Sequence, residues 1–250
     1  MKKPLISIII TYFRKKKFIK KTIKSILNQT YKNYELVFIY DDEDKTDLKF
    51  IKNTLIDVKK KKIIVNKKNQ GVAKSRNIAL KNCKGLYFAF IDADDIWKKS
   101  KLEKQLKFMK KNLIDFSFTS YSVINEQDKV LRVRKVFFDA EYFKLLKSNF
   151  IGLSTVMINR NLLSKIQFPD LKTQEDYALW LKLTRTGYKL KHFNQVLSYW
   201  RDAKNSLSSN IIHKIRDAFK LYYIYEKKNI IFSIYSVLIL SYNKIIKNLY

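Results

Sequence analysis

Three carboxylates stand within four residues at the end of one apolar stretch. Asp92, Asp94 and Asp95 follow the run GLYFAFI at 85–91, which has the composition of a buried strand. Carboxylates two positions apart on extended backbone point to the same side, so Asp92 and Asp94 can share one hard cation such as Mg²⁺ or Mn²⁺. The alternative is a solvated acidic turn in which one Asp caps a following helix. The elements around this run must decide between the two interpretations.

Length and composition narrow the class of protein. A chain of 250 residues fits one large α/β domain, and a hydrophobic content of 46% argues against a disordered protein. With only 4 Gly and 2 Pro, we expect no flexible linker between independent domains. The single cysteine, Cys83, excludes an internal disulfide and fits a reducing compartment. The N-terminal run MKKPLISIII has too short an apolar part for a secretory signal, so we predict a cytoplasmic protein.

The charge is strongly positive. The chain carries 52 Lys+Arg against 22 Asp+Glu, a formal net charge of +30. Such a charge attracts nucleic acid, an anionic membrane surface or phosphorylated substrates. The lysine runs are scattered along the chain, so the charge alone does not select one of these partners.

Strand and helix patterns alternate through the first hundred residues. Short runs rich in β-branched and aromatic residues predict buried strands at 5–11, 34–40 and 86–91, and a further strand at 62–66. Apolar residues at helical spacing predict helices between them, at about 18–27, at about 47–58 and after Gly71. This alternation predicts an α/β fold with a mostly parallel, doubly wound sheet.

Polar residues follow every one of these strands. In parallel sheets, ligands bind beyond the carboxyl ends of the strands, where the polar residues of successive strands meet. We therefore expect one site lined by Thr11 and Tyr12, Asp41 and Asp42, Asn66, Arg76 and Asn77, and the Asp92–Asp95 group. Such a convergence favours a ligand site over a set of solvated turns.

Five motifs, in this order, resemble inverting family 2 glycosyltransferases. They are SIIITYFR at 7–14, ILNQTYKNYELV at 26–37, Asp41-Asp42 with Thr46-Asp47, NQGVAKSRN at 69–77 and FIDADDIW at 90–97. The resemblance covers about residues 5–205 and implies the GT-A fold, an α/β sheet that binds a nucleotide sugar and carries an Asp-x-Asp metal site.

The resemblance also implies roles for individual residues. Asp41 and Asp42 would contact the nucleotide base and ribose, and Thr11, Tyr12, Arg76 and Asn77 would lie beside the donor. Asp94 would bind Mn²⁺ or Mg²⁺ directly, and Asp92 would bind the ribose or a metal-bound water. Arg201 would contact the diphosphate. The metal would stabilise the charge of the departing nucleoside diphosphate.

A second pair of acids lies in the segment TQEDYALWLKLTRTGY at 173–188, which predicts a helix with Thr173 as N-cap. Glu175 and Asp176 fall in its first turn, where acids also serve as ordinary complements of the helix dipole. The resemblance implies that this pair is catalytic and that Asp176 is the base. A carboxylate stabilised by the dipole is a weak base, so we expect burial near the acceptor site to raise its pKa.

The C-terminal segment differs from the rest. Residues 210–250 read as a helical, basic and aromatic tail that follows a catalytic domain at 1–209. Its apolar part, about 230–242, is shorter than the roughly 20 residues a spanning helix needs. One interpretation is an interfacial helix on an anionic membrane surface. The other is a helical hairpin packed on the domain or in a homodimer.

The expected function is a metal-dependent, inverting hexosyl transfer. The donor would be a nucleotide-diphosphate sugar and the acceptor a hydroxyl of a surface glycan such as lipopolysaccharide or capsule, including lipid-linked glycans, at the cytoplasmic face of the inner membrane. A nucleotidyltransferase is one alternative, but the segment TYFRKKK lacks the Gly-rich phosphate loop usual there. A nucleic-acid-binding protein would explain the charge but not the acids at the strand ends. No nucleic-acid motif is evident, so we expect no nucleic-acid partner.

Overall fold

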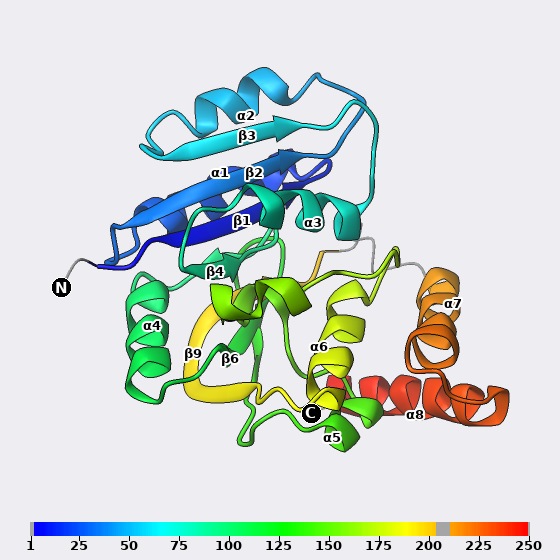
Figure 1. Cartoon of the computed structure of the whole chain (residues 1–250). Helices are drawn as coiled ribbons and strands as arrows, with labels where there is room; N and C mark the ends of the chain where they lie inside the picture. Colours follow the sequence, from blue (N-terminus) through cyan, green and yellow to red (C-terminus); the bar gives the residue numbers. More distant parts are fainter. Residues whose placement is uncertain (1–2, 204–210, 250) are drawn as a thin grey trace.

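The structure is a computed structural model that describes residues 3–203 and 211–249. Within these residues, one sheet of nine strands runs through the molecule in the order β3-β2-β1-β4-β8-β6-β9-β5, with β7 paired to β6 (Figure 1).

The first half of the sheet is parallel, as predicted. Its strands pair in register as neighbours and are β1 (Ile6–Tyr12), β2 (Tyr34–Tyr40), β3 (Lys61–Val65) and β4 (Tyr87–Phe90). The connecting helices are α1 (Lys16–Leu27), α2 (Leu48–Thr54) and α3 (Val72–Asn82). Alternate residues of β1 enter two different cores: Ile8 belongs to the same cluster as Ile23 of α1, and Ile9 belongs to the same cluster as Ala79 of α3. Burial on both faces explains why β1, β2 and β4 read as continuous apolar runs, whereas β3 is at the edge of the sheet and is largely exposed.

The second half has mixed strand directions, which the sequence did not reveal. β8 (Met157–Asn159) is antiparallel to β4 and to β6 (Phe116–Ile124), whereas β9 (Lys191–Arg201) is parallel to β6. Two short antiparallel strands, β5 (Ile96–Trp97) and β7 (Val130–Arg134), complete it, and α4 (Lys101–Lys111) packs beside β6 and β9. β8 has three residues and β6 alternates Ser and Thr with apolar residues, so neither gives a distinct strand signal.

The remaining helices gather on one side of this mixed half (Figure 1). They are α5 (Tyr142–Lys147), α6 (Glu175–Arg185), α7 (Ile211–Lys220) and α8 (Ile230–Leu249), with short turns at Leu153–Thr155 (η1), Arg160–Lys165 (η2) and Leu221–Tyr225 (η4). Leu221, Tyr222 and Val237 belong to the same core cluster as Trp180 of α6. The described part of the C-terminal segment therefore packs on the rest of the chain. The expected boundary at 209/210 lies outside the described residues.

Candidate functional site

Two buried carboxylates follow β2. Asp41 and Asp42 are each 3% exposed. Asp41 Oδ1 accepts hydrogen bonds from Asn66 Nδ2 at 2.7 Å and from the Gln70 amide at 2.8 Å. Asp42 Oδ2 lies 3.0 Å from Arg14 Nε. Both side chains are thus fixed at the edge of the parallel strands, where a donor nucleotide is expected.

Tyr12 does not lie open at this edge. Its side chain is fully buried, and its ring stacks on Tyr40 with 5.3 Å between ring centroids. Its hydroxyl donates to Asp47 Oδ2 at 2.7 Å. Alternation along β1 turns this ring into the core. A contact of Tyr12 with the donor stays a prediction. Thr11 is half-buried on the other face of the strand.

Asp95 holds the turn after β4. Its carboxylate is 1% exposed and accepts from the Arg201 amide at 2.9 Å and from Ser154 Oγ at 2.5 Å. Burial, together with the nearby charges of Asp94 and Asp92, raises the pKa of Asp95 well above its usual range. Asp95 is thus committed to the protein, which leaves Asp92 and Asp94 as the carboxylates that can meet a ligand.

Asp92 and Asp94 keep some exposure, at 34% and 13% of their side chains. Lys15 Nζ lies 2.8 Å from Asp94 Oδ2. Burial raises the pKa of Asp94. The positive charge of Lys15 lowers that pKa, and the negative charge of Asp92 raises it, with a net increase. The turn therefore holds negative charge that already attracts one cation.

The donor set suits a divalent ion only in part. The described residues contain no group of three or more His, Cys, Asp or Glu side chains arranged to hold a metal ion. Asp92 and Asp94 alone match the way Mg²⁺ is often bound, by one or two carboxylates with substrate phosphates and water as the other ligands. A divalent ion would also relieve the repulsion between the two carboxylates. The residues thus fit a metal site that the substrate completes.

Arg201 is enclosed by protein. Its side chain is fully buried. Its Nε donates to the Asp94 carbonyl at 2.8 Å and its Nη1 donates to the Asn125 carbonyl at 2.7 Å. In this structure the guanidinium is therefore occupied by protein partners, and its contact with a phosphate stays a prediction. Arg201 instead fixes the backbone of the Asp94 turn.

Asn77 is also committed to the protein. Its Nδ2 donates to the Phe168 carbonyl at 2.8 Å, and its Oδ1 accepts from the Phe168 amide at 2.9 Å. Each polar atom of the amide thus has a protein partner, and the contact of Asn77 with the nucleotide stays a prediction. Asn77 instead holds Phe168, whose ring centroid lies 5.5 Å from the Arg76 guanidinium carbon.

Arg76 joins the two acidic groups of the sequence. Its side chain is 6% exposed; Nη2 lies 2.8 Å from Asp92 Oδ1, and Nη1 pairs with Glu175 Oε1. Burial alone would lower the pKa of Arg76, but the carboxylates of Glu175 and Asp92 outweigh it and raise the pKa. This arginine brings the N-terminus of α6 to the turn after β4.

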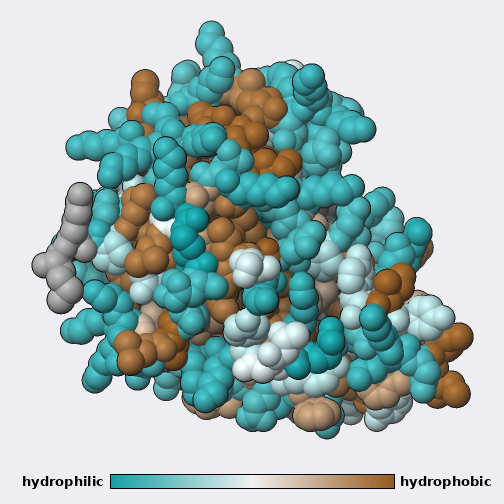
Figure 2. Space-filling view, viewed as in Figure 1, coloured by the Kyte–Doolittle hydropathy of each residue, from teal (hydrophilic) through white to brown (hydrophobic). Residues whose placement is uncertain are grey.

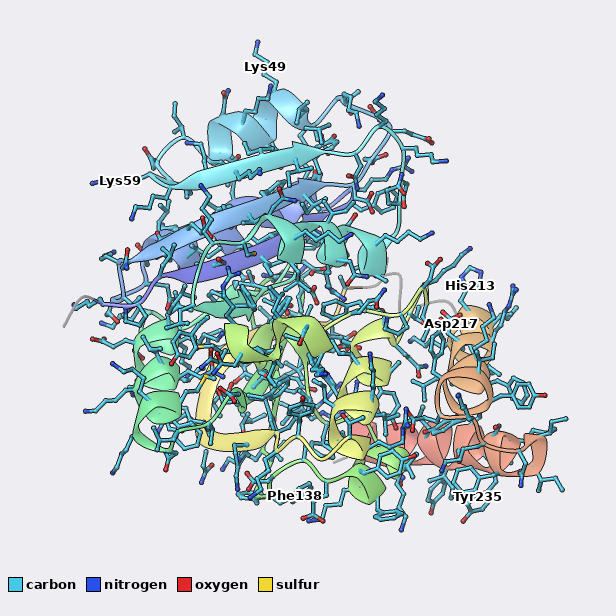
Figure 3. The ribbon with its side chains drawn as sticks, in the orientation of Figure 1. Lys49, Lys59, Phe138, His213, Asp217 and Tyr235 are labelled. Carbon is cyan, nitrogen blue, oxygen red and sulfur yellow. The ribbon has the colours of Figure 1, made fainter. Side chains whose placement is uncertain are left out.

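The turn before α6 differs from the expected cap. Gln174, with φ of 63°, occupies the N-cap position in a left-handed conformation that non-glycine residues rarely adopt. Thr173 was predicted as the cap, but its amide and its Oγ1 donate to Asp217 Oδ2 of α7 at 2.8 and 3.0 Å. Figure 3 labels Asp217 on α7. Thr173 is not the cap because the helix begins one residue later, after Gln174, and Thr173 is held by α7 instead, a contact that local sequence does not encode.

Asp176 has the properties of a base. Burial, then the charge of Glu175, raises its pKa to about 7, although Arg76 opposes the change and Asp92 adds to it. Its Oδ1 accepts from the Tyr177 amide at 2.6 Å, and the residue keeps intermediate exposure. The expected compensation by burial is present. A half-exposed carboxylate with a pKa near neutral pH can accept a proton from a bound hydroxyl.

Sequence reasoning missed Lys15, Ser154 and Asp217. Lys15 lies in a run of three lysines, and nothing in the run marks the one that reaches Asp94. Ser154 contacts Asp92 and Asp95, 62 and 59 positions away along the chain, and Asp217 contacts Thr173, 44 positions away. Their partners could not be found without the tertiary structure.

Comparisons with known proteins agree on the family. The family model described as Glycosyl transferase family 2 matches residues 7–166. The chain is 35% identical over 230 residues to a putative teichuronic acid biosynthesis glycosyltransferase, TuaG, of Bacillus subtilis (strain 168), covering 90% of this chain and 88% of that one. It is 39% identical over 211 residues to the Escherichia coli UDP-Glc:alpha-D-GlcNAc-diphosphoundecaprenol beta-1,3-glucosyltransferase WfaP, covering 82% and 80%.

Solved structures show the same fold. S. aureus TarS 1-349 in complex with UDP-GlcNAc superposes with a TM-score of 0.73 at 20% identity, covering 88% of this chain and 65% of TarS. The mannosyltransferase PcManGT from Pyrobaculum calidifontis, in complex with GDP-Man and Mn²⁺, gives a TM-score of 0.67 at 16% identity, covering 91% and 66%. The fold is of the GT-A type. The chain is a glycosyltransferase and belongs to glycosyl transferase family 2.

Proposed function

We propose that this glycosyltransferase moves a hexosyl unit from a nucleotide-diphosphate sugar to a hydroxyl of a lipid-linked glycan, with inversion. The observation that carries the proposal is the Arg76 bridge from Asp92 to Glu175, because it joins the donor carboxylates to the helix that bears Asp176. WfaP and WfgD of Escherichia coli, both relatives, are named as acting on diphosphoundecaprenol-linked GlcNAc. By analogy with these relatives, we propose that the chain acts in the synthesis of a surface polysaccharide.

The donor would lie across the ends of the parallel strands. Asp41 and Asp42 would accept hydrogen bonds from the nucleotide, with Thr11 beside them, and Asp92 would face the ribose or a metal-bound water. Mn²⁺ or Mg²⁺, when bound at Asp94 and Asp92, would supply positive charge to the departing nucleoside diphosphate. Arg201 and Asp95 would keep this turn in place through their contacts to its backbone and to Ser154.

Asp176 would perform the chemical step on the acceptor. It takes the proton of the acceptor hydroxyl while that oxygen attacks the anomeric carbon. The bond from the anomeric carbon to the diphosphate oxygen breaks on the opposite face, so one displacement inverts the configuration. Glu175, paired with Arg76, acts on this step by raising the pKa of Asp176 through its charge.

Two matched variants test the assignment. Transfer to GlcNAc-diphospho-undecyl would be measured with a panel of nucleotide sugars and Mn²⁺, and donor binding by thermal shift. Asp176→Asn should abolish transfer and leave the donor-induced shift intact, whereas Asp94→Asn should lose both transfer and the Mn²⁺-dependent shift. Asp170→Asn, at an exposed carboxylate, is the control. Full activity of either site variant would refute its assigned role.

We also propose that the C-terminal helices bring the enzyme to an anionic membrane surface. α8 carries apolar residues on two sides: Val237 is buried in the core of the domain, whereas Ile231, Tyr235 and Leu238 are 82%, 59% and 63% exposed. Figure 2 shows apolar surface at the edge where Figure 1 places α7 and α8, and Figure 3 labels Tyr235 there. Among the described residues, no helix combines the length and apolar content needed to cross a bilayer.

The positive charge supports a lipid partner over a second copy of the chain. A net charge of +30 attracts anionic lipid and repels an identical molecule. Peripheral association at the cytoplasmic face of the inner membrane would bring the site to lipid-linked acceptors. In this proposal, residues 1–209 form the catalytic unit and 210–250 the membrane contact.

Flotation with vesicles of phosphatidylglycerol and phosphatidylethanolamine tests this surface. Ile231→Glu with Leu238→Glu should abolish flotation without unfolding the chain, because both side chains are exposed. Ile56→Glu, at a 70% exposed residue outside α7 and α8, should float normally. Unchanged flotation of the double variant would refute the membrane contact, and a dimer lost in that variant during gel filtration would assign the surface to a second copy.

A further inference from the structure

One side of α1 is polar although it is buried. Thr22 and Ser25 of α1, and Gln29 just past its end, are 0%, 7% and 0% exposed. Their spacing of three and four residues places them on one side of the helix. Buried polar side chains are unfavourable unless they are hydrogen-bonded. The hydrogen bonds of this polar stripe therefore indicate its role.

The lower part of the stripe binds the backbone between β4 and α4. Ser25 Oγ accepts from the Trp97 amide at 3.2 Å, and Gln29 Nε2 donates to the Lys98 carbonyl at 2.9 Å. Gln29 Oε1 also accepts from the Leu102 amide at 3.0 Å. The segment that follows the acidic turn after β4 is thus fastened to α1.

Thr22 holds the acidic turn itself. Its Oγ1 lies 3.0 Å from the Ala93 carbonyl oxygen and 2.8 Å from the Asp95 carbonyl oxygen, so its hydroxyl hydrogen is shared between acceptors on either side of Asp94. Arg201 Nε donates to the Asp94 carbonyl between them at 2.8 Å. The outer two of three successive carbonyls are thus held from α1, and the middle one is held from β9. The course of the backbone through Asp94 is fixed from two sides.

Thr22 does not itself face a ligand. Its side chain is fully buried, and its hydroxyl already has two acceptors. Asp92 and Asp94, in contrast, keep 34% and 13% of their side chains exposed. The turn therefore binds α1 through its carbonyl groups and leaves carboxylates for a ligand. A cation gains from carboxylates that are held in place beforehand, because these groups then lose little further freedom when it binds.

We propose that Thr22 is a positioning residue for the divalent cation of the donor site. Through the Ala93 and Asp95 carbonyls it holds Asp94, and with it Asp92, where both carboxylates can bind one ion. The inference rests on the proposed function, which assigns a metal to these carboxylates, and deepens it by naming the residue of α1 on which their placement depends. Loss of a partner that orients a metal ligand typically weakens metal binding by about 10- to 100-fold.

Thr22→Val tests the role, because it removes the hydroxyl and keeps the shape of the side chain. Mn²⁺ would be titrated into the full chain with UDP or GDP present, and free Mn²⁺ measured by electron paramagnetic resonance. The dissociation constant of Mn²⁺ should rise about 10- to 100-fold in Thr22→Val and stay near the native value in Thr22→Ser, which keeps the donor. In transfer assays the half-saturating Mn²⁺ concentration should rise by the same factor. The kcat at saturating Mn²⁺ should change little, because Thr22 does not touch the reacting atoms.

Thr119→Val is the matched control. Thr119 is also fully buried, but its hydroxyl donates to the Ser120 carbonyl of β6 and not to the acidic turn. Thr119→Val should lose stability in urea denaturation and keep the native affinity for Mn²⁺. An unchanged Mn²⁺ dissociation constant in Thr22→Val, or an equal rise in Thr119→Val, would overturn the positioning role.

A second variant serves if Thr22→Val does not fold. Ser25→Ala releases the Trp97 amide of the same segment and should also raise the Mn²⁺ dissociation constant. Native affinity in Ser25→Ala would then overturn the inference. If the native chain binds no Mn²⁺ with either nucleotide, the metal assignment of the proposed function fails and the inference fails with it. Native binding that Thr22→Val leaves unchanged refutes the inference alone.

Discussion

The Arg76 guanidinium of α3 pairs with the Glu175 carboxylate of α6 across 99 positions of sequence. The two side chains are only 6% and 8% exposed. Because Arg76 also holds Asp92, this pair fixes the distance between the donor carboxylates and the helix that carries Asp176. One buried ion pair thus holds the turn after β4 against the N-terminal end of α6.

Breaking this pair should be costly. Arg76→Met leaves the Glu175 carboxylate buried without its counter-charge, so we expect the free energy of unfolding to fall by about 3–5 kcal/mol. Replacing both partners, Arg76→Met with Glu175→Leu, should recover a large part of the loss. Urea denaturation of the single and double variants measures both values. If Arg76→Met is as stable as the native chain, the pair does not contribute to stability.

Activity should depend on pH through Asp176. The base works only when deprotonated and its pKa is raised to about 7, so kcat/KM should fall about tenfold per unit below pH 7 and level off above it. Glu175→Gln removes a charge that raises this pKa, so its acid limb should move to lower pH. A profile unchanged in Glu175→Gln, or a limb near pH 4 in the native enzyme, would contradict Asp176 as the titrating base.

Metal dependence should respond to Lys15. Its Nζ lies 2.8 Å from Asp94 Oδ2, so a cation that binds this carboxylate must displace it. Activity should vanish with EDTA and return with Mn²⁺, and Lys15→Met should lower the half-saturating Mn²⁺ concentration several-fold. Lys17→Met removes the same charge from a lysine that pairs with Glu126 instead and serves as control. A higher Mn²⁺ requirement in Lys15→Met would mean that this lysine assists the site when the metal is bound.

α7 should influence catalysis through Asp217. Its carboxylate accepts two hydrogen bonds from Thr173, next to the left-handed Gln174 that begins α6. Asp217→Ala leaves a buried amide and hydroxyl unsatisfied, so we expect a loss of about 1–3 kcal/mol in the free energy of unfolding and a lower kcat. Steady-state kinetics measure this change. A lower kcat with an unchanged affinity for the donor would locate the effect at α6. The exposed Asp57→Ala is the control, and a native kcat in Asp217→Ala would rule out the coupling.

Much of the parallel half could be predicted because its signals are local. A strand buried on both faces must be apolar along its whole length, so β1, β2 and β4 stand out in the sequence. Polar residues directly after them mark the edge where ligands bind. The mixed half gave no such signal, because β8 is short and β6 alternates small polar with apolar residues.

The roles within the site were less predictable than its location. Tyr12, Asn77 and Arg201 are polar residues at the expected edge, but each directs its side chain into the protein. Which polar group faces a ligand depends on partners from distant segments, and residue type does not reveal them.

The sequence by itself determined the family, the parallel strands and the two acidic groups, because motif order and apolar periodicity are local properties of the chain. Only the tertiary structure decided that Arg76 joins those groups, that Lys15 faces Asp94 and that Asp176 has a pKa near 7. The physical reason is that burial and charge at one point in space depend on every segment that packs there. The same carboxylate in an isolated helix would be an ordinary acid, and packing raises its pKa toward neutral.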